Sequence, residues 1–193
     1  MSFKKSKCEC NEINEQTFRF QQVVVYQQFL NIAQCTNVIK VAEAYGNMFG
    51  WTTDRHKHYP TTDILITPQF GDFYSFITNR IQTKLFPLFE KIFRIKKQYL
   101  RLHELFIVKY DGNKKNTQNS LQAHTDITAF SFVIALNDNF EGGGTYFLNI
   151  NKQVQLNIGS IVLFSGKNLH EGITTKKGIR YILTGFVSYD ICD

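Results

Sequence analysis

The sequence has few of the residues that break or cross-link a chain. It contains three prolines, none after residue 88, and no low-complexity block, which excludes a proline-rich linker. The four cysteines are Cys8, Cys10, Cys35 and Cys192. None of them forms a C-x-x-C pair or stands at zinc-finger spacing. We therefore interpret them as free thiols. The C-x-C formed by Cys8 and Cys10 could bind a metal, but a disordered tail is the favoured interpretation.

Long apolar runs are also missing. No stretch approaches the ~20 residues of a membrane span, and the N-terminus has charge but no apolar region of the kind found in secretory signals. We therefore expect a cytoplasmic protein with no membrane partner. Lys and Arg exceed Asp and Glu by 22 to 16, a net charge of +6. The basic residues are scattered rather than gathered in one stripe, which argues against a nucleic-acid partner and favours anionic co-substrates.

Aromatic residues, in contrast, are plentiful. Eighteen Phe and nine Tyr among 193 residues favour a β-rich core, and the length favours a single domain. We expect a flexible tail at 1–17, a support region of helices and strands at 18–99, and a core of short strands at 100–190. In the support region we expect a strand at 18–26 and helices at 31–45 and 73–95. Pro87 should kink or split the second helix.

The second half predicts eight short strands separated by turn signals. Their ranges are 102–110, 121–124, 127–136, 145–150, 153–156, 160–164, 169–174 and 179–189. This pattern indicates a mainly β (α+β) protein with a jelly-roll core, also called a double-stranded β-helix, and N-terminal helices packed on one sheet. In jelly-roll wiring strand one pairs with eight, two with seven, three with six and four with five. The polar, irregular segments 50–68 and 111–120 are expected to form flaps.

Four residues in this half suggest a site. His124-Thr125-Asp126 is followed by His170 and then by Arg180. Two imidazoles and one carboxylate suit a non-haem Fe(II) site with open coordination positions. The predicted wiring places His124, which ends strand two, beside His170 in strand seven. It also places Arg180 beside Tyr110, deeper inside. A guanidinium on that apolar face requires an anion, such as the far carboxylate of an organic acid.

Each of these signals has an ordinary alternative. An isolated H-x-D tripeptide is common on surfaces and in turns, and a single histidine is often structural. The combination in the right order on the right strands is more specific. Gly142, Gly143 and Gly144 are either a flexible hairpin or a place where a ligand approaches the backbone closely. Glu171 is not expected to be a ligand, because adjacent strand residues point to opposite faces.

Two stretches carry a resemblance to a known family, over residues 106–190. They are FIVKYDGNKKNTQNSLQAHTDITAFSFVIALNDNFEGGGTYF and GSIVLFSGKNLHEGITTKKGIRYILTGFVSYD. They resemble the catalytic domain of Fe(II)/2-oxoglutarate-dependent oxygenases, most closely the procollagen lysyl hydroxylase and prolyl 4-hydroxylase branch. Residues 51–64 are similar to the upstream region of small oxygenases of this branch. Two departures from the family pattern are Val133, where lysyl hydroxylases tend to have asparagine, and Thr174-Thr175 in place of prolines.

The resemblance implies a set of roles. His124, Asp126 and His170 would bind Fe(II), and Arg180 would pair with the distal carboxylate of 2-oxoglutarate. The Tyr110 hydroxyl would help to hold that co-substrate, and Thr145 would line the same pocket. The implied cofactors are Fe(II), 2-oxoglutarate and O₂, with ascorbate as a candidate accessory.

The implied activity is hydroxylation of a peptidyl lysine or proline, with decarboxylation of 2-oxoglutarate to succinate. Three alternatives stay open. The first is the same chemistry on a small molecule or free amino acid. The second is a non-catalytic jelly-roll binding module, and the third is a cupin-like dioxygenase that needs no co-acid. Nucleic-acid demethylation is disfavoured, because the second arginine of such demethylases would fall at Phe186.

Overall fold

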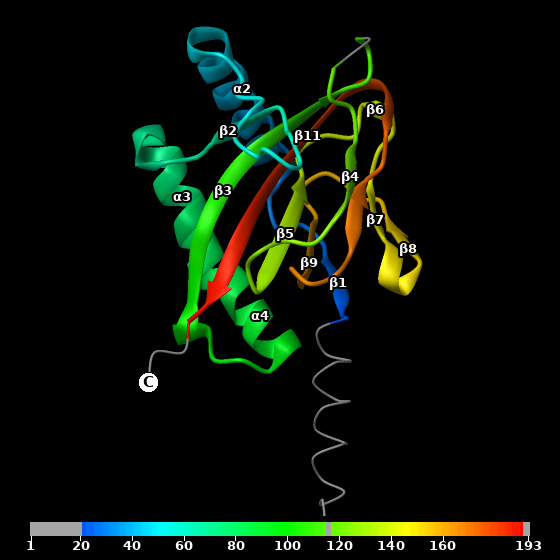
Figure 1. Ribbon diagram of the computed structural model, residues 1–193. Helices are drawn as coiled ribbons and strands as arrows, with labels where there is room; N and C mark the ends of the chain where they lie inside the picture. The colour runs from blue at the N-terminus through cyan, green and yellow to red at the C-terminus, as the bar shows by residue number, and fades with distance from the viewer. Residues whose placement is uncertain (1–20, 115–116, 191–193) are drawn as a thin grey trace, which may run out of the picture.

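Two antiparallel sheets face each other in the computed structural model, which describes residues 21–114 and 117–190. Within these residues the larger sheet has seven strands in the order β1-β9-β5-β11-β3-β2, with β6 paired to β11. The smaller sheet has four strands in the order β4-β10-β7-β8. Figure 1 shows the helices on the outer side of the larger sheet and the smaller sheet on its other side. The expected jelly-roll core is confirmed.

The strands and helices have the following bounds. The strands are β1 Val23–Tyr26, β2 Asp63–Leu65, β3 Leu100–Asp111, β4 Leu121–His124, β5 Phe130–Ala135, β6 Phe140–Gly142, β7 Thr145–Phe147, β8 Lys152–Val154, β9 Ile161–Ser165, β10 His170–Gly172 and β11 Thr175–Tyr189. The helices are α2 Ile32–Phe49, α3 Asp72–Arg80 and α4 Phe86–Phe93, with a π-turn η2 at Ile81–Leu85 and short 3₁₀ turns η1 Pro68–Phe70, η3 Lys97–Tyr99 and η4 Leu148–Ile150.

The predicted pairing of the core strands is observed in all four cases. Strands β3 and β11 pair, as do β4 and β10, β5 and β9, and β7 and β8. Two further pairings, of β11 with β5 and β10 with β7, join these pairs into the two sheets. The wiring therefore brings the strands that carry the histidines and the arginine into direct contact with their expected partners.

Helix positions follow from the sequence with one refinement. Asn31 caps α2 through a capping box with Gln34, and Gly50, with φ of 88°, ends the helix, because its positive φ costs glycine little. The predicted second helix is divided ahead of Pro87, by the π-turn at Ile81–Leu85, and Pro87 lies in the first turn of α4. The Phe86 N–H donates to the Ile81 carbonyl five residues back, and Pro87, one residue later, has no N–H to continue the α-helical pattern.

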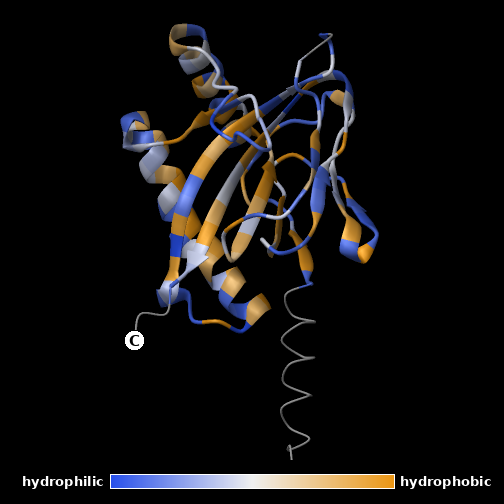
Figure 2. Ribbon diagram, viewed as in Figure 1, coloured by the Kyte–Doolittle hydropathy of each residue, from blue (hydrophilic) through white to orange (hydrophobic). Residues whose placement is uncertain are grey.

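The main core lies between the helices and the larger sheet. It includes Cys35 and Val38 from α2, Phe89 from α4, and Phe130 and Leu163 from the sheet. Figure 2 shows the middle strands of the larger sheet mostly in orange, the colour of hydrophobic residues. The expected packing of N-terminal helices on one sheet is confirmed. A second, smaller apolar cluster lies between the two sheets and includes Phe106, Phe147 and Phe164.

Some expectations need adjustment at the edges. The strand expected at 127–136 begins only at Phe130. Backbone bonds between the 126–129 segment and Gly166 turn the chain before that point. Segment 50–68 is not irregular throughout, because β2 pairs with β3. Residues 18–20 of the expected first strand, the expected tail 1–17, and Cys8, Cys10 and Cys192 lie outside the described residues. In the described part of the chain no helix has the length and apolarity needed to span a membrane.

Candidate metal and co-substrate site

His124, Asp126 and His170 converge at one end of the space between the sheets. His124 ends β4 and His170 begins β10, and the two residues are direct partners in the strand pair. Asp126 lies two residues beyond His124, where a bond from its N–H to the Gly166 carbonyl fixes the chain. All three residues are at most 9% exposed. The predicted proximity of the two histidines is thus present in the fold.

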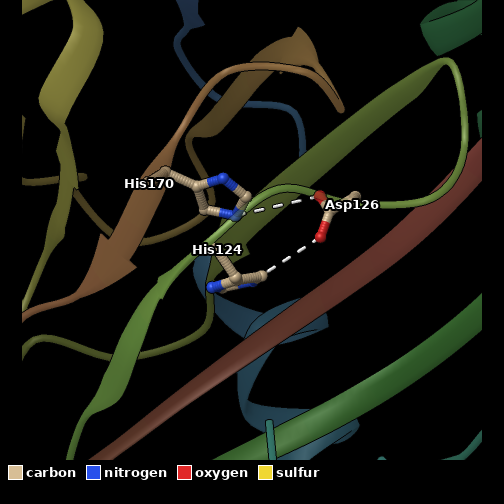
Figure 3. Close-up of side chains that lie close together, drawn as sticks. All are labelled: His124, Asp126 and His170. Carbon is tan, nitrogen blue, oxygen red and sulfur yellow. Dashed lines mark ion pairs between the residues drawn. The ribbon is translucent and has the colours of Figure 1, made fainter. Parts of the chain in front are cut away.

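The geometry of these three side chains suits a shared ion (Figure 3). The Nε2 atoms of His124 and His170 lie 3.5 and 3.8 Å from the two carboxylate oxygens of Asp126. The ligand atoms all lie within 4.8 Å of one another. Atoms bound ~2.1 Å from one ion lie ~3–4 Å apart, so small side-chain adjustments would bring all three atoms onto one ion. Two imidazoles and one carboxylate are the donor set of a non-haem Fe(II) centre.

Neighbouring groups orient the three side chains. The Nδ1 atoms of His124 and His170 bond the carbonyls of Gln122 and Asn168 at 2.7 and 2.8 Å, which leaves each Nε2 free to face the centre. The Ser131 hydroxyl donates to Asp126. Burial lowers the pKa of His170, against the opposing effect of Asp126. The lowered pKa favours the neutral imidazole, which is the form that binds a metal.

Arg180 lies deeper in the same cavity. It is 6% exposed, it is the direct partner of Tyr110 in the β11–β3 pair, and its guanidinium lies 5.3 Å from the Tyr110 ring centre. Burial lowers the pKa of Arg180 and raises that of Tyr110. No carboxylate of the described residues pairs with Arg180. A buried cation without an anionic partner is a place where an anion would bind.

Small residues clear the space beside Arg180. Gly143 has φ of 70°, and a Cβ at this position would lie 3.0 Å from the Arg180 side chain and 2.9 Å from Phe140. Thr145 in β7 and Val133 in β5 both line the cavity. At Gly143 the absence of a side chain therefore allows a close approach to the backbone, as one of the two interpretations of residues 142–144 expected. The group that comes close is the Arg180 side chain.

The three ligand candidates and Arg180 line one cavity of about 410 Å³. The structure brings together every residue expected at the site: His124, Asp126, His170, Arg180, Tyr110 and Thr145. Glu171 does not line the cavity, in agreement with the alternation of strand faces. The segments expected as flaps contribute to cavity walls. Residues 55–59 and 61 line this cavity, and 117–120 line a smaller polar one next to it.

Several lining residues were not predicted from the sequence. The Tyr59 ring lies 4.8 Å from the His124 ring, and His56 packs on Phe106. Glu104 lies on the same face of β3 as Tyr110. Strand alternation back from Tyr110 could have identified Glu104, but nothing in the sequence of the 55–59 segment indicates where it folds.

This combination of fold and candidate ligands resembles that of the Fe(II)/2-oxoglutarate-dependent oxygenases, and the comparisons with known proteins agree with the resemblance. The chain is 32% identical over 167 residues to the multifunctional procollagen lysine hydroxylase and glycosyltransferase of Caenorhabditis elegans. It is 31% identical over 168 residues to procollagen-lysine,2-oxoglutarate 5-dioxygenase 1 of Gallus gallus. These matches cover 80% and 79% of the chain. No protein-family model matches the sequence.

The chain spans only 22% of the length of these two relatives. Solved structures with the same fold cover most of both chains. The 2-oxoglutarate complex of the viral collagen prolyl hydroxylase vCPH from Paramecium Bursaria Chlorella virus-1 has a TM-score of 0.63 at 14% identity, covering 86% of this chain and 94% of that one.

Two further solved structures share the fold. A Pseudomonas putida prolyl-4-hydroxylase has a TM-score of 0.69 at 13% identity, with coverage of 94% and 98%. The α-ketoglutarate-dependent epimerase SnoN from nogalamycin biosynthesis has a TM-score of 0.68 at 13% identity, with coverage of 95% and 84%. The expected resemblance to this oxygenase family is therefore confirmed in sequence and in fold.

Proposed function

We propose that the protein is an Fe(II)- and 2-oxoglutarate-dependent hydroxylase of a lysyl or prolyl side chain in a polypeptide. The observation that carries this proposal is the convergence of His124, Asp126 and His170 in a cavity whose inner end holds the buried cation Arg180. Relatives named as procollagen lysine hydroxylases, and a fold shared with prolyl hydroxylases, support the choice of substrate.

His124, Asp126 and His170 would hold the iron, since their free donor atoms face one point and their other atoms are occupied by bonds to the backbone and to Ser131. Iron(II) held there would allow O₂ to oxidise a C–H bond of the substrate to an alcohol, with one oxygen atom going to the substrate and the other to 2-oxoglutarate, which would become succinate and CO₂. Phe147 and Phe164 pack against the His170 ring and keep water away from one side of the site.

Arg180 would bind the far carboxylate of 2-oxoglutarate and so fix the co-substrate with its oxo-acid end toward the three ligands. Tyr110 would add its hydroxyl, and Thr145 would line the wall of the same pocket. The positions of all three within one cavity favour these roles. Because these groups are held by paired strands rather than by loops, the co-substrate would meet a rigid site.

A second candidate is the same chemistry on a small molecule. It is favoured by the equally close fold match to SnoN, an epimerase from nogalamycin biosynthesis. A non-catalytic binding module is the third candidate, and the complete ligand set together with Arg180 argues against it. A cupin-like dioxygenase that uses no co-acid would supply no anion to pair with the buried charge of Arg180.

Succinate formation tests the proposal. The full chain is incubated with Fe(II), 2-oxoglutarate and ascorbate in air, with libraries of lysine- and proline-containing peptides and with free amino acids. Mass spectrometry then follows succinate and the addition of one oxygen atom to each candidate. We expect peptide-dependent succinate and a peptide 16 Da heavier. Succinate coupled to oxygen addition on free amino acids alone would favour the small-molecule candidate, and no succinate with any compound would contradict the proposal.

A matched pair of variants links this activity to the site. Asp126→Asn keeps the shape of the side chain but removes the negative charge that would bind iron, so we expect loss of turnover in a folded protein. Asp138→Asn makes the same change at an exposed turn position and should leave turnover unchanged. Retention of activity in Asp126→Asn would show that the ligands are misassigned.

A further inference from the structure

The floor of the cavity is a ladder of paired residues from β3 and β11. Because side chains alternate along a strand, every second residue of each strand faces the cavity. The pairs, from the inner end outward, are Tyr110 with Arg180, Val108 with Ile182, Phe106 with Thr184, and Glu104 with Phe186. All eight residues line the same cavity. The ladder therefore runs without interruption from the co-substrate end to Glu104.

The two ends of this ladder carry opposite charges. Arg180 lies at the inner end, and Glu104 lies six residues from Tyr110 along β3, which corresponds to a separation of about 20 Å at ~3.3 Å per residue. Between the two charges the ladder is apolar except for Thr184, whose hydroxyl is occupied by a bond to the Phe132 carbonyl at 2.7 Å. Glu104 is thus the next charged residue of the ladder beyond Arg180.

Glu104 is only half satisfied by its neighbours. Its Oε2 atom accepts from Arg55 Nη1 at 2.8 Å, while no group of the described residues bonds its Oε1 atom. Its side chain is 32% exposed. A carboxylate in this state retains both charge and hydrogen-bonding capacity for a ligand.

Arg55 does not cancel this charge. Its Nε atom bonds the fully buried Asp63 at 2.7 Å, and its guanidinium stacks 4.4 Å from the Phe106 ring centre. Its remaining Nη2 atom is buried out of contact with solvent, so a ligand cannot reach it. One guanidinium between two carboxylates leaves a net charge of −1 on the three groups. Of the two carboxylates, Glu104 lines the cavity beside Arg55, whereas Asp63 does not line it.

Other titratable groups near this end do not reverse the sign. Burial, followed by the charge of Arg55, lowers the pKa of His56, which favours its neutral form. Lys57, His58 and His103 are exposed at the rim, where water screens their charges. The outer end of the cavity therefore presents a partly buried carboxylate, beside the aromatic rings of Phe106 and Phe186 and the guanidinium of Arg55.

We propose that Glu104 recognises a positively charged group of the primary substrate and so selects substrates that carry an ammonium or guanidinium over those that do not. This inference rests on the proposed function and narrows it from lysyl or prolyl substrates to cationic ones. The cation belongs either to the lysyl side chain that reacts or to a basic residue beside the reacting one. Glu104 would contact it directly, while Arg55 and Asp63 position the Glu104 carboxylate.

Binding of small probes tests the recognition without turnover. The full chain, kept anaerobic with Fe(II) and 2-oxoglutarate, is titrated calorimetrically with n-pentylammonium and with n-pentanol. We expect the ammonium to bind about tenfold more tightly, the scale of one hydrogen bond to a charged group. Glu104→Gln should remove this preference, because glutamine still accepts from Arg55 but has no charge. Glu90→Gln, the same change on α4 beyond the other face of the larger sheet, should leave it unchanged. Equal binding of the two probes by the wild-type protein, or a preference that survives in Glu104→Gln, would overturn the proposal.

Peptide kinetics identify the source of the cation and exclude a purely structural effect. Three peptides are compared: one with a target lysine, one with a target proline flanked by lysine, and one with proline and no basic residue. Glu104→Gln should raise KM about tenfold for at least one lysine-containing peptide, with kcat little changed, and the peptide affected identifies the source. A similar rise in KM for the peptide without basic residues would show that the variant only disturbs the 55–61 segment, and would refute the proposal. Absence of succinate with every peptide would count against the hydroxylase function, while the calorimetric result would still report on Glu104.

Discussion

Arg180 allows a prediction in which stability and function change in opposite directions. Methionine at this position keeps much of the length of arginine but removes a charge that is 6% exposed and has no carboxylate partner in the described chain. Replacing buried charged groups with apolar ones is often neutral or stabilises a protein by ~1–4 kcal/mol. The contact with the Tyr110 ring offsets part of this, since a cation–π pair contributes ~0.5–2 kcal/mol. We expect Arg180→Met to increase the free energy of unfolding by about 1–2 kcal/mol.

For a chain of this length, such a change raises the melting temperature by ~2–4 °C per kcal/mol. The response to 2-oxoglutarate should change in the other direction. A ligand at 100 times its Kd stabilises the native protein by ~2.7 kcal/mol, and Arg180→Met should lose most of this gain because the anion has no partner.

Thermal melts with and without 2-oxoglutarate measure both effects, and Arg101→Met, at an exposed arginine, serves as the control. If Arg180→Met is destabilised by more than ~1 kcal/mol and still gains stability from 2-oxoglutarate, then Arg180 is a structural residue and its assignment to the co-substrate fails.

Two further predictions concern the scaffold. Phe89 is fully buried, with its ring 5.1 Å from that of Phe130, so Phe89→Ala should lower the free energy of unfolding, measured by urea denaturation, by ~3–5 kcal/mol. Leu88→Ala, at a half-buried position, should lower it clearly less. Equal losses in the two variants would show that α4 does not anchor the core through Phe89. Burial raises the pKa of the Cys35 thiol from 9.0 to about 11, so iodoacetamide at about pH 8 should modify Cys35 only after unfolding. Because the folded state holds this proton more tightly, the free energy of unfolding should fall as the pH rises from 9 toward 11. Rapid modification of Cys35 in the native protein, mapped by mass spectrometry, would contradict the first expectation.

The core strands and the four central residues could be predicted because their signals are local. Turn residues mark the strand ends, and jelly-roll wiring then pairs His124 with His170 and Arg180 with Tyr110. The register of those pairs follows from the two-residue alternation of side chains. No long-range information beyond the topology was needed for this part of the site.

The outer end of the cavity could not be predicted because it depends on contacts between distant segments. Arg55 and Glu104 are separated by 49 residues, and the 55–61 segment has neither periodicity nor regular structure to indicate its course. Strand β2 was missed for a related reason, since three residues are too short to give a pattern. Pro87 allowed us to predict a break in the second helix, but not that the backbone would form a π-turn before the proline.

Strand β11 is fifteen residues long and continuous from Thr175 to Tyr189. One strand therefore sets the distance between Arg180, the proposed anchor of the co-acid, and Phe186, at the end where we propose that the substrate binds. Exchange of residues at the Glu104–Phe186 pair would leave Arg180 and the proposed iron ligands in place. Deletion of a single residue between Arg180 and Phe186 would instead turn every later side chain of the strand to the opposite face. If the proposed roles hold, substrate preference could change by substitution at the outer pairs, whereas a change of strand length would turn the outer side chains away from the cavity.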